Sequence, residues 1–169
     1  MAIIYEPILN STTNCGSSGD AFFQPYSINS TNDRFRYNIL VFNNGASQEE
    51  IFGAFRVPSQ YAGSACVVAE YTMTGATGSI VLAFNYRTVA SGISGQSFDQ
   101  TGQTESTSAA FASPSAANLR REAVVPLTSG NFINGDKVQF ELIRDPTHAT
   151  DTAASPLLVH GVYFGYQNS

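Results

Sequence analysis

Two histidines, His148 and His160, and many serines could together supply the base and the nucleophile of a hydrolase. The Gly-x-Ser-x-Gly turn that presents such a serine does not occur in the sequence, and residues 16–19 (GSSG) lack its spacing. His148 falls in a polar stretch and His160 in an apolar one. In such places a lone histidine is ordinarily a solvated turn residue or a hydrogen-bonded residue of a core or interface. The sequence therefore does not favour serine-hydrolase chemistry.

The segment RDPTHATDT places Asp145, His148 and Asp151 close together, and carboxylate and imidazole groups can bind divalent cations. Neither the EF-hand pattern nor the His-Glu-x-x-His pattern is present, and Asp and Thr side chains commonly form turns with their own backbone. The two cysteines, Cys15 and Cys66, fit neither a zinc site nor a disulfide framework. We expect no metal ion, no other cofactor and two free thiols.

Hydrolysis of a glycan would need two carboxylates on either side of a cleft, roughly 5–9 Å apart. The available glutamates are Glu49, Glu50, Glu70, Glu122 and Glu141. Binding of a glycan without hydrolysis would need an exposed aromatic side chain on which a sugar ring can stack. Tryptophan is absent, and most of the 8 tyrosines and 12 phenylalanines occupy core-facing positions of expected strands. Phosphate-loop and dinucleotide-binding patterns are also absent, so we expect a protein without enzymatic activity.

Charged residues make up 12% of the chain, well below the usual ~25%, and apolar residues make up 43%. Hydroxyl and amide side chains supply the polarity, which suits a surface that lies against other protein. The net charge of −5 and the lack of a basic stripe argue against nucleic-acid binding. No apolar run approaches the ~18 residues of a membrane span, and the N-terminus lacks the pattern of a secretory signal, so we expect neither.

Strand patterns dominate the sequence. Residues 64–74 and 78–90 read as a hairpin joined by a glycine-rich turn, and residues 137–144 alternate cleanly between apolar and polar. Further strands are expected at 34–42, 49–58, 119–128 and 157–166. No amphipathic helix of ten residues is found. The pattern predicts an all-β protein, an antiparallel two-sheet β-sandwich of jelly-roll type with an extended N-terminal arm.

We expect residues 1–18 to form this arm and residues 19–169 to form a single sandwich domain with a long loop at 91–118. The last strand is apolar at both parities, with Leu157, Val159 and Tyr163 on one of them. A strand with one face in water should alternate, so a loop or a neighbouring subunit is expected to cover its second face.

The C-terminal stretch GDKVQFELIRDPTHATDTAASPLLVHGVYFGY (135–166) resembles the ending of small structural proteins of tailed bacteriophages. Those proteins end in a G-D-x-V/L-x-F-x-L-x-R-D strand, a loop containing D-T-A and a final apolar strand. Residues 55–90 are similar to their F-R-x-P-x-x-Y segment and the long hairpin that follows it. The resemblance covers residues 52–90 and 119–166 and contains no catalytic signature.

The resemblance implies a capsid decoration (cement) protein that binds and stabilises the shell of a virion. The expected partners are the major capsid protein and further copies of the chain, as a homotrimer on the capsid exterior after synthesis in the host cytoplasm. The arm would add a strand to a neighbour or lie on the capsid floor. Residues expected at the interface are Ile3, Ile4, Tyr5, Ile8, Phe98, Phe111, Leu157, Val159 and Tyr163.

Two other functions fit the residues. One is a tail or fibre head domain that binds a host cell-surface glycan, which predicts exposed aromatic side chains at loop tips such as Phe98 and Phe111. The other is a small jelly-roll enzyme acting on carbohydrate, which predicts two carboxylates facing one cleft.

Overall fold

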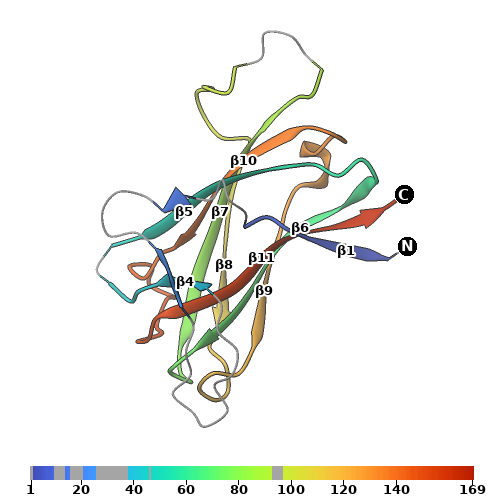
Figure 1. Cartoon of the computed structure of the whole chain (residues 1–169). Helices are drawn as coiled ribbons and strands as arrows, with labels where there is room; N and C mark the ends of the chain where they lie inside the picture. Colours follow the sequence, from blue (N-terminus) through green and yellow to red (C-terminus); the bar gives the residue numbers. More distant parts are fainter. Residues whose placement is uncertain (1, 10–13, 16–20, 26–37, 46, 93–96) are drawn as a thin grey trace.

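The computed structural model describes residues 2–9, 14–15, 21–25, 38–45, 47–92 and 97–169. These residues form two antiparallel sheets packed face to face, so the predicted all-β sandwich is confirmed (Figure 1). The first sheet, sheet A, has the order β3 (Phe22–Pro25), β4 (Asn38–Phe42), β11 (Leu157–Asn168), β6 (Tyr61–Met73), β9 (Arg121–Pro126), and β1 (Ile3–Pro7) also pairs with β11. The second, sheet B, has the order β2 (Asn14–Cys15), β5 (Glu49–Arg56), β10 (Lys137–Arg144), β7 (Ser79–Val89), β8 (Glu105–Ala112).

The core lies between the two sheets and is rich in aromatic rings. Phe164 of β11 stands 4.9 Å from Phe55 of β5 and 5.2 Å from Phe132, measured between ring centroids. Phe140 of β10 stacks on Phe84 of β7 at 5.4 Å. On β10 the core-facing side chains are those of Val138, Phe140 and Leu142, which explains the alternating pattern that the sequence shows in 137–144.

The hairpin of β6 and β7 closes as its sequence predicts. Gly78 lies at the start of β7 with φ +88°, and a Cβ there would come within 2.6 Å of the Thr152 carbonyl oxygen. Only glycine fits this backbone conformation and this close approach.

A β-bulge in the last strand explains its apolar residues at both parities. Val159 pairs with Tyr71 of β6, whereas Gly161 pairs with Glu70, so one additional residue of β11 is inserted between these pairs. The insertion reverses which side chains face inward. Leu157 and Val159 point into the core before the bulge, and Val162, Phe164 and Tyr166 do so after it. No neighbouring subunit is needed to bury these five side chains.

The N-terminal arm is extended, as predicted, but it pairs within its own chain. β1 runs antiparallel to the second half of β11, from Ile3 opposite Gln167 to Pro7 opposite Tyr163, and β2 pairs with β5. The expectation of a strand donated to a neighbour is therefore wrong for the described part of the arm, because β11 offers it a free edge. Figure 1 shows the two chain ends side by side.

The segment 91–118 was expected to be one long loop, but it contains β8, which pairs along its whole length with β7. Its alternation is weak because its residues are mainly Ser, Thr and Ala. The described residues between β7 and β8 project from one end of the sandwich (Figure 1). The one short helix among the described residues is a 3-10 turn at Ser129–Asn131, and none is long and apolar enough to cross a membrane.

Candidate functional site

A shallow groove of about 290 Å³ lies on the outer face of sheet B. Four strands place one side chain each in a row across it: Phe52 on β5 is opposite Glu141 on β10, Glu141 is opposite Asn85 on β7, and Asn85 is opposite Ser106 on β8. Strand alternation turns these side chains outward, since their neighbours along each strand fill the core.

Hydrogen bonds fix the polar part of this row. The Ser106 hydroxyl donates to Asn85 Oδ1 at 2.6 Å, and Asn85 Nδ2 donates to Glu141 Oε2 at 2.7 Å. A carboxylate can only accept, so the Asn85 amide has a single orientation that satisfies both neighbours. The three side chains are therefore held in place before any ligand arrives.

The next row of the groove contains Gln139 on β10 opposite Arg87 on β7. Arg87 Nη1 donates to the carbonyl oxygen of Gln100 at 2.6 Å, which ties the projecting segment to the groove wall, where Gln103 also lies. Gln139 Oε1 is the one buried side-chain polar atom in the described residues that has no hydrogen-bond partner. Such an atom is costly unless a ligand or water supplies a donor.

Phe52 supplies the apolar part of the groove. Its side chain is 41% exposed, although a phenylalanine ring is normally buried. The adjacent Gly53 faces the core, where a Cβ would meet the Phe140 ring at 2.5 Å, so this part of β5 is closely packed against β10. The groove therefore offers an exposed ring beside a fixed polar row.

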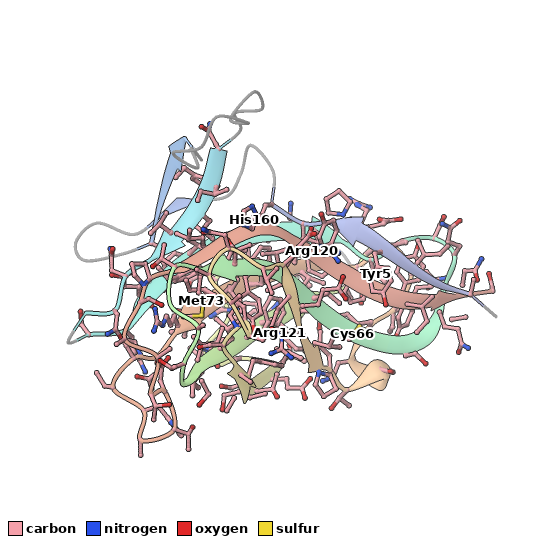
Figure 2. All side chains as sticks on the ribbon, turned by 90° about the horizontal axis from the view of Figure 1, so that it is seen from below. Tyr5, Cys66, Met73, Arg120, Arg121 and His160 are labelled. Atoms are coloured by element: carbon pink, nitrogen blue, oxygen red, sulfur yellow. The ribbon has the colours of Figure 1, made fainter. Side chains whose placement is uncertain are left out.

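The outer face of sheet A has a different character, and we call it the apolar face. Two neighbouring rows cross β9, β6, β11 and β1: Val124, Val68, Tyr163 and Pro7 in one, and Pro126, Cys66, Gly165 and Tyr5 in the other. Tyr5 is 54% exposed and Val124 48%. Tyr5, Arg120 and His160 follow one another along this face in Figure 2.

Charged groups border the apolar face at one end. Arg120 forms ion pairs with Glu70 and Glu122, which are cross-strand partners on β6 and β9. The Tyr163 hydroxyl donates to Glu70 at 3.3 Å, and burial together with this carboxylate raises the pKa of Tyr163. His160 Nε2 lies 2.8 Å from the Thr72 hydroxyl, and burial lowers the pKa of His160. Glu70 and Glu122 thus share one guanidinium, the arrangement of a structural ion-pair cluster.

The nine residues expected at an interface fall into separate places. Ile3, Tyr5 and Phe98 are exposed, Phe98 in the projecting segment. Ile4 and Phe111 are partly buried and pack against the core, and Tyr163 is partly buried on the apolar face. Ile8, Leu157 and Val159 are core residues, so their expected place at an interface is corrected. Leu157 and Val159 face the core together with Phe164 and Tyr166 because of the bulge at His160–Gly161.

The loop from Asp145 to Asp151 uses its side chains for turns and for one buried ion pair. Asp145 Oδ1 accepts hydrogen bonds from the Thr147 amide and hydroxyl, and His148 Nδ1 lies 2.9 Å from the Thr150 hydroxyl. Asp151 binds Arg144, and both side chains are fully buried. No group of three or more His, Cys, Asp or Glu in the described ranges could hold a metal ion.

Solved structures with a similar fold include several proteins that act on or bind carbohydrate. A family 35 carbohydrate-binding module from Clostridium thermocellum is 12% identical, with a TM-score of 0.53 over 97% of this chain and 98% of that chain. The arabinose-bound α-L-arabinofuranosidase MgGH51 is 12% identical, with a TM-score of 0.53 over 95% of this chain and 24% of that chain. The K2 cleaved adhesin domain of Lys-gingipain is 9% identical, with a TM-score of 0.50 over 96% of this chain and 99% of that chain.

These likenesses concern the fold alone, a two-sheet β-sandwich of jelly-roll type. No protein-family model matches the sequence, and no curated protein sequence matches it.

Sequence reasoning missed the groove. The strands expected at 78–90 and 137–144 contain Asn85, Arg87, Gln139 and Glu141, of which Glu141 is also one of the glutamates available for a catalytic pair. The alternation of each strand predicts that these side chains face outward. The pairing register that places them side by side across the sheet cannot be predicted from the sequence.

Proposed function

We propose that this protein is a non-catalytic glycan-binding module and that the groove on sheet B holds the glycan. One observation carries the proposal: an exposed aromatic ring, Phe52, stands beside a pre-arranged polar row, Glu141, Asn85 and Ser106, with the unpaired oxygen of Gln139 next to it. A sugar has the matching surfaces, an apolar C–H face for the ring and hydroxyl groups for the polar row.

The similar solved structures support the same class of function. Their names describe a carbohydrate-binding module, an arabinose-bound arabinofuranosidase and an adhesin domain. The proposal matches the glycan-binding alternative of the sequence analysis, although it places the site on a sheet face and not at loop tips. Phe98 in the projecting segment is 58% exposed and lies two residues from Gln100, which Arg87 binds.

Replacing the groove ring tests the proposal. We expect the protein to be retarded in native affinity gels that contain a suitable polysaccharide. Phe52→Ala should weaken this binding about 5- to 30-fold, since stacking on an aromatic ring contributes roughly 1–2 kcal/mol. The matched control is Phe23→Ala, which removes an exposed ring from sheet A and should leave binding unchanged. Equal effects of the two variants, or no retardation by any polysaccharide of a broad panel, would contradict the proposal.

A second candidate, the capsid decoration protein of the sequence analysis, is favoured by the apolar face. Eight residues in two adjacent rows, without a charge among them, form a surface typical of protein association. On this account the face packs against another copy of the chain or the major capsid protein. Co-sedimentation with undecorated capsids tests it, and a pair of charges at Tyr5→Glu and Val124→Glu should abolish pelleting. A monomer that ignores capsids would contradict it.

A further inference from the structure

We infer that the groove on sheet B selects neutral glycans with free hydroxyl groups and rejects glycans that carry carboxylate or other anionic groups. This inference rests on the proposed function, since it concerns the ligand class of the same groove. It follows from the direction of the hydrogen bonds across the groove.

Two side chains of the polar row, Ser106 and Glu141, present oxygens that accept, whereas Asn85 keeps one N–H of its amide. The proton of the Ser106 hydroxyl is used in the bond to Asn85, so the lone pairs of this oxygen remain for a ligand. Glu141 accepts from Asn85 through Oε2, and its Oε1 accepts no hydrogen bond from the described residues. A ligand that meets Ser106 and Glu141 must therefore donate, which a sugar hydroxyl does and an anionic group cannot do.

Gln139 adds a third acceptor to the same groove. Its Oε1 is buried and has no partner among the described residues, so it lacks a donor in this structure. It lies one row from Glu141 on the same strand, about 7 Å away along β10.

The carboxylate of the polar row acts in the same direction. Glu141 stands in the centre of the polar row and repels an anion there. Arg87, the one cation among the described lining residues, lies outside this row, opposite Gln139, and its Nη1 donates to the Gln100 carbonyl at the groove wall. Three strand spacings, about 14 Å, separate Phe52 from Ser106. A ligand long enough to touch both ends of this row must pass over the Glu141 carboxylate.

Two series of polysaccharides test the inference. The first compares neutral β-glucan, mannan, xylan and galactan with polygalacturonate and alginate in affinity gels and titration calorimetry. The second takes the neutral polysaccharide that binds best and compares it with its 6-carboxylate and O-methylated forms, because these differ from it only in charge or in donors. We expect binding to neutral chains, with at least about tenfold loss on carboxylation or methylation.

Glu141→Gln serves as the variant, since it keeps an acceptor but removes the charge. It should reduce the preference for the neutral chain over its carboxylated form, whereas Glu122→Gln on the apolar face should not change it. Equal or tighter binding of the carboxylated or methylated chain, with Phe52 still required, would overturn the inference and leave glycan binding intact. Failure to bind any of these polysaccharides would overturn both.

Discussion

Arg144 joins two loops that lie far apart in the sequence. Its guanidinium donates to Asp151 through Nε and Nη2, to the carbonyl oxygens of Asn43 and Ser155 through Nη1, and to that of Ala153 through Nη2. The Asp151 carboxylate also accepts from the Val81 amide at 3.0 Å. A buried ion pair with so many partners is costly to break, because each group left behind is charged or polar and has no access to water.

Arg144→Met keeps an unbranched apolar stem and removes all the side-chain donors. We expect it to lower the free energy of unfolding by about 3–5 kcal/mol, since Asp151 is left buried without a counter-charge. Urea unfolding followed by circular dichroism measures this loss. Arg120→Met is the matched control, because Arg120 is 62% exposed and its ion pairs should contribute less than about 1 kcal/mol. A loss no larger than that of the control would contradict the structural role of Arg144.

At the scale of elements, the β-bulge of β11 decides how the last strand is buried. It allows a strand with apolar residues at both parities to place Leu157 and Val159, and then Phe164 and Tyr166, on the same inner side. Gly161 suits the position because a Cβ there would come within 2.5 Å of the Tyr163 hydroxyl oxygen.

Deleting Gly161 should prevent folding. Without the additional residue, Val162, Phe164 and Tyr166 would turn outward, and the loss of three buried side chains corresponds to roughly 5–9 kcal/mol, comparable to the whole stability of a domain. Soluble expression and a cooperative thermal transition by circular dichroism report the outcome. Deleting Gly102, an exposed glycine of the projecting segment, is the control and should be tolerated. A Gly161 deletion that unfolds at the normal temperature would contradict this account of β11.

The strands that could be predicted from the sequence are those with strong alternation. β6, β7 and β10 carry large apolar side chains at every second position, and the turn before Gly78 marks their hairpin. β8 could not be predicted, since small residues give little contrast between its two faces. The bulge could not be predicted either. An inserted residue changes the parity of a strand without any composition of its own, so apolar residues at both parities suggested an outer face covered along the whole strand. On that face Leu158 is buried, together with Ile39 and Val41.

At the scale of the whole molecule, the two outer faces differ. Sheet B presents a groove with a fixed polar row, whereas sheet A presents two apolar rows bordered by Arg120 and its two glutamates. Because the sheets lie back to back, a partner on the apolar face would leave the groove open. The low charge of the sequence indicated association surfaces in general, but the division between the faces depends on pairing across strands.

The measurement that tests the central claim most directly is a nuclear magnetic resonance titration of the isotope-labelled protein with the oligosaccharide that binds best. We predict that shifts of backbone amide signals are confined to sheet B, around Phe52, Asn85 and Gln139, and are absent from Phe52→Ala at the same ligand concentration. Shifts centred on Tyr5, Val68 and Tyr163 of the apolar face, or no shifts with any oligosaccharide, would contradict the claim that the groove of sheet B is a glycan-binding site.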